Sequence, residues 1–201
     1  MNFLSIDCST DIGTLFIKAK NKTFIKVLQS DKSNNDLLMK QILDFFNENN
    51  IKFKDLSMIF VNEGPGNFSG LRSSLATAKG ISLSKGLILY GYNTFIWSCS
   101  KFYNLENSVF SLIKFRDKYF IKKFDKELKS TSETIKITKE KIINKYKEKF
   151  IVIPKNYKKE FDEKILKLNN ISIVDLDHNE LESLQIKGLL NKGLVKPLYM
   201  S

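Results

Sequence analysis

The fold is decided by the stretch Asn62-Glu63-Gly64-Pro65-Gly66-Asn67-Phe68-Ser69-Gly70-Leu71-Arg72, which holds three of the nine glycines within seven residues. It follows an apolar run at 58–61 and precedes a helix-like run at 71–83. A strand, a glycine-rich turn and a helix in this order can hold an anion on backbone N–H groups. The same order can serve only to turn the chain sharply between two packed elements. One of these two roles is expected for the motif loop, Gly64, Pro65, Gly66, Phe68, Ser69, Gly70 and Arg72.

The composition is that of a globular protein of 201 residues, 42% of them hydrophobic, which is enough for one domain or two small lobes. No apolar run reaches the ~18–20 residues of a membrane span. The first seven residues lack the basic region of a signal peptide. Cys8 and Cys99 match no zinc or CxxC spacing, so we expect a reduced cytoplasmic protein without a membrane partner.

The positive charge is concentrated in the second half of the chain. The formal net charge is +11, and residues 92–201 carry 22 Lys and Arg against 14 Asp and Glu, a net +8. Such a half favours an acidic partner such as RNA. However, only Arg72 and Arg116 are arginines, and phosphate sites usually use arginine for its bidentate fork. A merely solvated lysine surface therefore stays open as the other interpretation.

The first half predicts the order β-β-β-α-β-α-β-α, with an antiparallel start and a turn at Asn21-Lys22. A helix is expected over residues 34–49, with Ser33 or Asn35 as its N-cap. Its apolar residues cover roughly 240° of the helix surface, whereas a surface helix needs a stripe of about 100°. This helix either buries a second face against a partner or lies central in its own core. The second helix, near 70–84, carries small residues that allow close approach. The candidate partner interface is Leu37, Leu38, Ile42, Phe45, Ser73, Ala76, Thr77 and Gly80.

The second half repeats the α/β pattern more loosely. A hairpin is expected over 109–115 and 118–124, around Arg116-Asp117, and a polar loop over 127–134. Helices are expected from Thr138 to about 147, after Pro154, and over 181–190, with strands at 150–153 and 171–176. The whole is an α/β protein of two lobes, with residues 1–94 as the first and 95–201 as a smaller second lobe. The last few residues could pack back on the first lobe.

The motif Gly64-Pro65-Gly66-Asn67-Phe68-Ser69-Gly70-Leu71-Arg72 resembles the signature Gly-Pro-Gly-Ser-Phe-Thr-Gly-Leu/Val-Arg of the TsaB family, also called YeaZ. The opening Ile6-Asp7-Cys8-Ser9-Thr10 is similar to that family's Ile-Asp-Thr-Ser/Ala-Thr. Phe115-Arg116 before Tyr119 resembles its Asp-Ala-Arg…Tyr segment, with Lys114 where the family has Asp. The ending Val195–Met200 resembles its closing Pro-x-Tyr-Leu/Val-Arg. The resemblance spans the chain and is strongest in residues 1–95.

This resemblance implies a two-lobed fold of the actin and sugar-kinase type (ASKHA, ribonuclease-H-like), with mixed sheets flanked by helices. It implies a non-catalytic subunit that binds TsaD and supports formation of N6-threonylcarbamoyladenosine in tRNAs reading codons that start with A. Further implied partners are the ATPase TsaE and a second copy of the chain, with tRNA reached indirectly through the complex. TsaC makes the donor for this reaction. ATP or ADP could sit at the interface with TsaD.

An ATP-dependent phosphotransferase is the alternative function, and a free-standing tRNA-binding protein is another. Kinases of this fold hold phosphates between glycine-rich loops of both lobes. Asp7, Ser9 and Thr10 could form a vestigial first loop, but residues 92–187 contain no glycine for the second. We therefore expect no autonomous nucleotide site, and Asp7 is expected to hydrogen-bond the adjacent turn.

No metal site or catalytic residue is expected. His178, the only histidine, lies among acidic residues near a helix start. Cys8 is expected to be buried, and Trp97 to be part of the core. Arg72 falls in the first helical turn, where the helix dipole disfavours a cation. A loop-bracing ion pair with Glu63 is the favoured compensation, and a partner carboxylate or a shared nucleotide site is the alternative.

Overall fold

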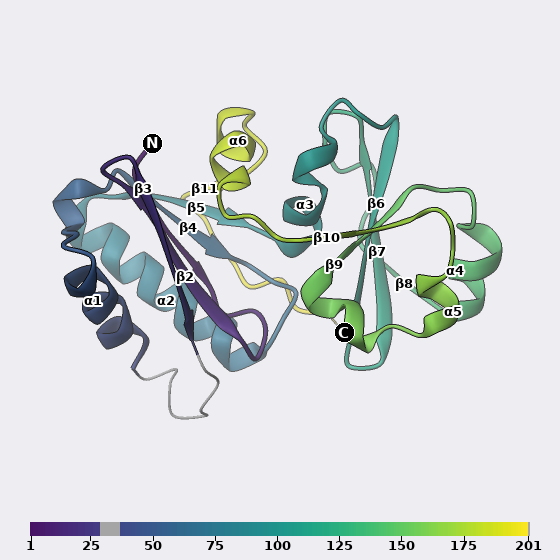
Figure 1. Ribbon diagram of the computed structural model, residues 1–201, viewed down its shortest axis with the longest axis horizontal. Helices are drawn as coiled ribbons and strands as arrows, with labels where there is room; N and C mark the ends of the chain where they lie inside the picture. Colours follow the sequence, from purple (N-terminus) through teal and green to yellow (C-terminus); the bar gives the residue numbers. More distant parts are fainter. Residues whose placement is uncertain (29–36, 201) are drawn as a thin grey trace. The chain divides into compact units, whose positions relative to one another are not determined.

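The computed structural model describes residues 1–28 and 37–200, and it divides into two compact units (Figure 1). Unit 1 comprises Met1–Asn93 together with Leu190–Ser201, and unit 2 comprises Thr94–Leu189. The chain therefore leaves unit 1 at residue 94 and returns to it at residue 190. Each unit is an α/β structure built on its own mixed sheet.

The sheet of unit 1 has the strand order β11-β5-β4-β1-β2-β3. β1, β2 and β3 are antiparallel neighbours, while β4 and β5 continue the sheet in parallel from β1. β1 and β4 are buried along their whole length, as expected of central parallel strands that are covered on both faces. The strands are β1 (Phe3–Asp7), β2 (Gly13–Ala19), β3 (Lys22–Leu28), β4 (Met58–Asn62), β5 (Ile88–Tyr92) and β11 (Asn191–Lys192).

Two helices, α1 (Leu38–Glu48) and α2 (Phe68–Lys85), lie beside each other on one face of this sheet (Figure 1). α2 ends at Gly86, which adopts the left-handed conformation (φ 66°) typical of helix C-caps. The expected start of the first helix at residue 34, with its caps Ser33 or Asn35, lies outside the described residues. A short 3-10 turn, η1 (Phe53–Asp55), precedes β4.

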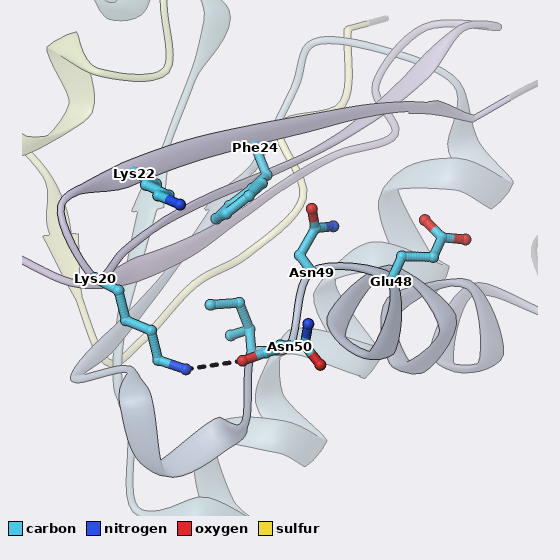
Figure 2. Close-up of a pocket in the computed structure, with 7 residues that line it drawn as sticks. Lys20, Lys22, Phe24, Glu48, Asn49 and Asn50 are labelled. Carbon is cyan, nitrogen blue, oxygen red and sulfur yellow. Dashed lines mark hydrogen bonds between the residues drawn. The ribbon is translucent and has the colours of Figure 1, made fainter.

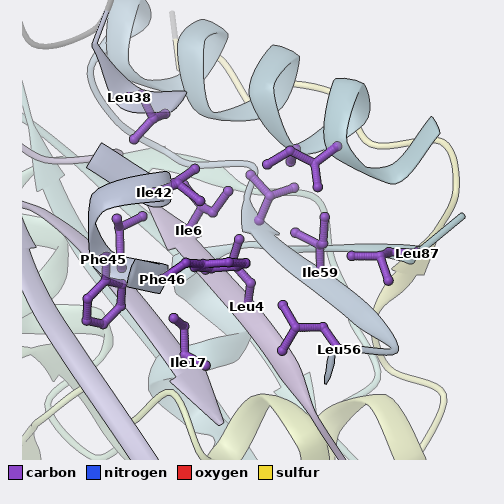
Figure 3. Close-up of a cluster of buried hydrophobic side chains, with 14 of the residues drawn as sticks. Leu4, Ile6, Ile17, Leu38, Ile42, Phe45, Phe46, Leu56, Ile59 and Leu87 are labelled. Carbon is purple, nitrogen blue, oxygen red and sulfur yellow. The ribbon is translucent and has the colours of Figure 1, made fainter. Parts of the chain in front are cut away.

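The core of unit 1 lies between the sheet and these two helices (Figure 3). Alternate residues of the strands, such as Leu4 and Ile6, point toward the helices. The buried residues of α1 are Leu38, Ile42, Phe45 and Phe46. The helix is thus central to the core of its own unit, which was one of the two sequence interpretations.

Unit 2 has a sheet in the order β10-β9-β6-β7-β8. β6, β7 and β8 are antiparallel, and β9 and β10 continue in parallel from β6. This is the topology of unit 1, with β6 in the place of β1. The strands are β6 (Ser108–Phe115), β7 (Lys118–Asp125), β8 (Ile135–Ile137), β9 (Ile151–Pro154) and β10 (Ile171–Val174). The helical elements are α3 (Thr94–Cys99), η2 (Ser100–Phe102), α4 (Lys139–Lys145), η3 (Lys155–Glu160), α5 (Glu163–Leu166) and α6 (Glu180–Ile186).

Several sequence expectations need correction. The first hairpin turns at Lys20-Asn21 and not at Asn21-Lys22. The residues with positive φ are Lys20 (53°) and Asn21 (59°). Such values fit a two-residue turn that matches the twist of the strands. The short strands β8 and β11 had no sequence signal of their own. The lysine-rich stretch after Pro154 forms the 3-10 helix η3 and the single-turn α5, not one continuous helix.

Within the described residues, no helix combines the length and the apolar character needed to cross a membrane.

Neighbouring residues on α1 should respond differently to truncation. Ile42 is fully buried, whereas Leu43 is 42% exposed. We expect Ile42→Ala to lower the unfolding free energy by about 2–5 kcal/mol, because it leaves a cavity in the core. Leu43→Ala should cost about 0.5 kcal/mol or less. Urea unfolding followed by circular dichroism measures both, and similar losses would contradict the packing described here.

His178 should make unit 2 sensitive to acid. It is buried with its ring 4.8 Å from that of Trp97, and burial lowers its pKa from 6.5 to about 4. Between these values the unfolded chain binds a proton that the folded chain does not, so stability falls as pH decreases from 6.5 toward 4. The loss amounts to about 3 kcal/mol below pH 4.

In His178→Gln, that part of the pH dependence should be absent. Thermal unfolding at pH 7 and pH 4.5 for both proteins provides the comparison. An unchanged difference between the two pH values would show that other groups cause the acid sensitivity.

Candidate functional site

The motif loop lies directly on the turn that follows β1. A Cβ atom on Gly66 would lie 2.1 Å from the carbonyl oxygen of Ser9, and one on Gly70 would lie 2.2 Å from that of Cys8. Both distances are too short for any side chain, so glycine is required at both positions. The backbone N–H of Asn67 donates to the Ser9 oxygen at 2.7 Å and fixes this approach. These glycines therefore permit contact between two loops of the protein itself.

A buried polar network joins the same two loops. Asp7 Oδ1 accepts hydrogen bonds from the Ser9 backbone N–H (2.9 Å) and from Asn62 Nδ2 (3.1 Å). Asn62 Oδ1 in turn accepts from the backbone N–H of Gly64 at 2.8 Å. Burial raises the pKa of Asp7, and the hydrogen bonds from Ser9 and Asn62 act in the opposite direction. The expectation that Asp7 hydrogen-bonds the adjacent turn is confirmed.

The groups proposed as a vestigial phosphate loop are already engaged within the protein. The N–H of Ser9 is donated to Asp7, and Thr10 Oγ1 donates to the carbonyl oxygen of Ile12 at 2.9 Å. Two of the loop's donors therefore face inward or back onto the chain. A phosphate bound here would have to displace these bonds.

Glu63 fastens the C-terminal tail to the loop. Its buried carboxylate accepts from Asn191 Nδ2 at 2.8 Å and from the backbone N–H of Lys196 at 3.0 Å. Its own carbonyl oxygen accepts from the N–H of Leu198 at 2.6 Å. Burial raises the pKa of the carboxyl, while these hydrogen bonds lower it. Sequence reasoning did not foresee this role, since the partners are more than 120 residues away.

Arg72 forms an exposed cluster with two aromatic rings. Its guanidinium lies 4.1 Å from the centroid of the Phe68 ring, and its Nε donates to Tyr199 Oη at 3.3 Å. The two rings are themselves 5.2 Å apart. The favoured ion pair with Glu63 is not formed, and the Glu63 carboxylate binds the C-terminal tail instead. Cation–π contact, not a carboxylate, accompanies this arginine at the helix start.

The predicted partner interface divides into buried and exposed residues. Leu38, Ile42 and Phe45 belong to the core, so they cannot form an exposed docking surface in this structure. The exposed apolar residues near this surface are Leu37, which precedes α1, and Met39 and Leu43 on the helix itself. On α2, Ala76 and Gly80 are exposed, Ser73 and Thr77 are half-buried, and Leu83 is 86% exposed.

The remaining motif residues take different environments. Gly64, Pro65 and Gly66 are buried, whereas Phe68 and Ser69 are exposed at the start of α2. Ser69 Oγ donates to Asn67 Oδ1 at 3.2 Å. The first part of the motif is therefore buried and packs inside the protein, whereas Phe68 and Ser69 lie on the surface.

The cysteines are poorly suited to nucleophilic chemistry. Burial raises the pKa of the Cys8 thiol to about 12, with the charge of Asp7 adding to the effect. Burial likewise raises the pKa of Cys99 to about 12. Both remain thiols at neutral pH, and the thiolate is the reactive form. In the part of the chain that the structure describes, no three His, Cys, Asp or Glu residues gather in a way that could hold a metal ion.

A pocket of about 380 Å³ opens between the β2–β3 turn and the end of α1 (Figure 2). Sequence reasoning gave no indication of it. Lys20 Nζ donates to the Asn50 carbonyl oxygen at 2.8 Å and lies 3.3 Å from Asp55. The pocket is lined by Lys20, Lys22, Phe24, Glu48, Asn49, Asn50 and Ile51.

The sequence of this chain is similar to those of proteins involved in tRNA threonylcarbamoyladenosine synthesis. The family model of TsaD, described as tRNA N6-adenosine threonylcarbamoyltransferase, matches residues 29–160. The tRNA threonylcarbamoyladenosine biosynthesis protein TsaB of Buchnera aphidicola subsp. Baizongia pistaciae is 31% identical over 85 residues. That alignment covers 42% of this chain and 38% of the relative, well under half of its length.

Two solved structures share the fold over nearly the whole chain. YeaZ from Pseudomonas aeruginosa superposes with a TM-score of 0.71 at 13% identity, covering 99% of each chain. A protein of unknown function with an actin-like ATPase fold, from Bacteroides thetaiotaomicron, gives a TM-score of 0.51 at 10% identity, covering 92% of this chain and 95% of that one.

Two units of matching topology, each a mixed sheet with helices, have the actin-like fold that the resemblance implied. Within this fold class the chain belongs to the TsaD family, whose model matches more than half of its length. It is similar to a TsaB protein in sequence over 85 residues and to YeaZ in fold.

Two glycines of α2 should behave in opposite ways when replaced by alanine. Gly70→Ala forces a methyl group against the Cys8 carbonyl oxygen and should cost about 1–3 kcal/mol of unfolding free energy. Gly80 has nothing within 4 Å of an added Cβ, so Gly80→Ala should stabilise the helix by about 0.5–1 kcal/mol. Chemical denaturation of both variants tests this, and a harmless Gly70→Ala would refute the loop contact.

Proposed function

We propose that this chain is a non-catalytic subunit that binds a TsaD-type transferase and supports synthesis of N6-threonylcarbamoyladenosine in tRNA. Membership of the TsaD family, together with the sequence similarity to a TsaB protein, carries the proposal. The reaction would take place on the transferase, in the cytoplasm, for tRNAs reading codons that start with A. TsaE would join the same assembly, and tRNA would be modified in it.

The state of the loops supports a non-catalytic role. In the candidate phosphate loop, the N–H of Ser9 donates to Asp7. The glycine loop packs against the backbone of this candidate phosphate loop. Residues 92–187 supply no glycine for a second phosphate loop. A nucleotide such as ATP or ADP would therefore bind where the partner completes the site, and not on this chain alone.

The docking surface we propose is the outward face of α1 and α2. Met39 and Leu43 are one turn apart on α1, and Ala76, Gly80 and Leu83 follow a helical stripe on α2. These exposed residues lie outside the buried faces of the two helices, at the flank of the buried face on α1 and opposite it on α2. A stripe of small and apolar residues lets a partner helix approach closely. The same face would serve if a second copy of the chain takes the place of the transferase.

Gly80→Arg should separate docking from folding. The position has open space in the isolated chain and arginine favours a helix more than glycine does, so folding should be unaffected or slightly improved. Co-purification with the TsaD-type protein of the same organism should be lost, because the long side chain would stand between the two helix surfaces. Thr131→Arg adds the same charge at an exposed position of unit 2 and is the matched control.

The biological readout is the modified nucleoside. In cells lacking their own TsaB, the wild-type chain with its transferase should restore N6-threonylcarbamoyladenosine in tRNA, measured by mass spectrometry. Gly80→Arg should not restore it, whereas Thr131→Arg should. Normal partner binding by a folded Gly80→Arg would overturn the proposed surface, and lack of restoration by the wild type would overturn the function itself.

A further inference from the structure

The tip of the β6–β7 hairpin and the adjoining strand β8 carry cations without acidic partners. Among the described residues, Arg116, Lys118 and Lys136 each lack a carboxylate partner. The one acid at the tip, Asp117, lies 3.3 Å from Lys114 and is thereby engaged. The tip thus has a local excess of positive charge that the protein itself does not neutralise.

The register of the sheet places Lys118 and Lys136 on one face, together with Phe115. Phe115 lies opposite Lys118 in the β6–β7 pair, and Phe120 lies opposite Lys136 in the β7–β8 pair. Lys118 and Phe120 are two residues apart on the same strand, so their side chains share a face. Phe115, Lys118 and Lys136 therefore point to the same side of the sheet, and both lysines are exposed.

The two lysines are close enough to repel each other. The charge of Lys118 is the main cause that lowers the pKa of Lys136. Two like charges so placed repel each other, and an anion between them would relieve the repulsion. A phosphate group, with several acceptor oxygens, is suited to accept hydrogen bonds from both.

Arg116 adds a planar group to this pair. Its guanidinium lies 5.3 Å from the centroid of the half-buried Phe115 ring, and it stands in a turn whose two residues have positive φ values of 49° and 60°. This cation–π contact places the guanidinium beside the aromatic ring. It is also one of only two arginines in a chain whose other 31 basic residues are lysine.

We infer that this face, formed by Phe115, Arg116, Lys118 and Lys136, binds the phosphate backbone of single-stranded RNA, such as the loop of a tRNA. Lysines and an arginine contact the phosphates, and the guanidinium and aromatic ring offer a platform for an unstacked base. An acidic protein segment would pair with the positive charges but has no base to stack on the guanidinium and the aromatic ring. RNA is therefore favoured as the ligand. The inference goes beyond the proposed function, in which the chain reaches tRNA only through its partner.

The test uses the full chain and an unmodified 17-nucleotide anticodon stem-loop, labelled for fluorescence anisotropy, at several salt concentrations. The double variant Lys118→Glu/Lys136→Glu should weaken binding by about tenfold or more and make the salt slope shallower by about 1 to 2. The control Lys158→Glu/Lys159→Glu changes the net charge equally on exposed residues of η3, and should weaken binding by less than about threefold.

A conservative variant tests the platform. Arg116→Lys keeps the charge and removes the planar guanidinium, and it should weaken binding by about two- to fivefold. Equal losses in the test and control pairs, or no binding by the wild type at 50 mM salt, would overturn the inference. Circular dichroism checks that the variants are folded.

Partner binding separates this inference from the proposed function. The Lys118→Glu/Lys136→Glu variant should still co-purify with the TsaD-type protein, while Gly80→Arg should still bind the RNA. Loss of both activities in either variant would count against the inference, since it would show a general effect and not a distinct site.

Discussion

The contact between the glycine loop and the turn after β1 is the constraint on which unit 1 depends. Gly66 and Gly70 bring two backbones so close that no other residue fits. The polar groups excluded from water at this junction must find partners inside it, since an unpaired buried donor or acceptor costs about 1–3 kcal/mol. Asp7, Ser9 and Asn62 provide those partners. Close approach and hydrogen bonding therefore have to be satisfied together.

This junction also determines what α2 presents to the outside. Once Gly70 is fixed against Cys8, the rotation of the helix about its axis is set. Leu71, Leu75 and Ala78 are then buried, while Arg72 and Ala76 are exposed. A motif that looks like a ligand cradle thereby acts through packing, by orienting a helix surface. The same loop carries the exposed Phe68 and Arg72, so its structural and surface parts are only a few residues apart.

The sequence predicted most of the regular structure because the patterns were local. The antiparallel start, the helix after the glycine loop and the hairpin around Arg116-Asp117 each follow from short-range periodicity or turn residues. β11 was missed because Asn191–Lys192 pairs with β5 across about 100 residues and has no pattern of its own. The wide apolar surface of α1 was recognised, but periodicity could not assign Leu38, Ile42 and Phe45 to the core. That assignment depends on which strands lie beneath the helix.

The return of the chain to unit 1 has a consequence for the order of folding. Residues 94–189 form a continuous segment that can fold as soon as it has been made, whereas unit 1 lacks β11 and the partners of Glu63 until residues 191–198 follow. During synthesis the sheet edge at β5 is unpaired, and the Glu63 carboxylate lacks the donors that compensate for its burial. The first unit to emerge from the ribosome is thus the last to be completed, and it is exposed to proteases and to wrong strand pairing for the time needed to translate the whole of unit 2.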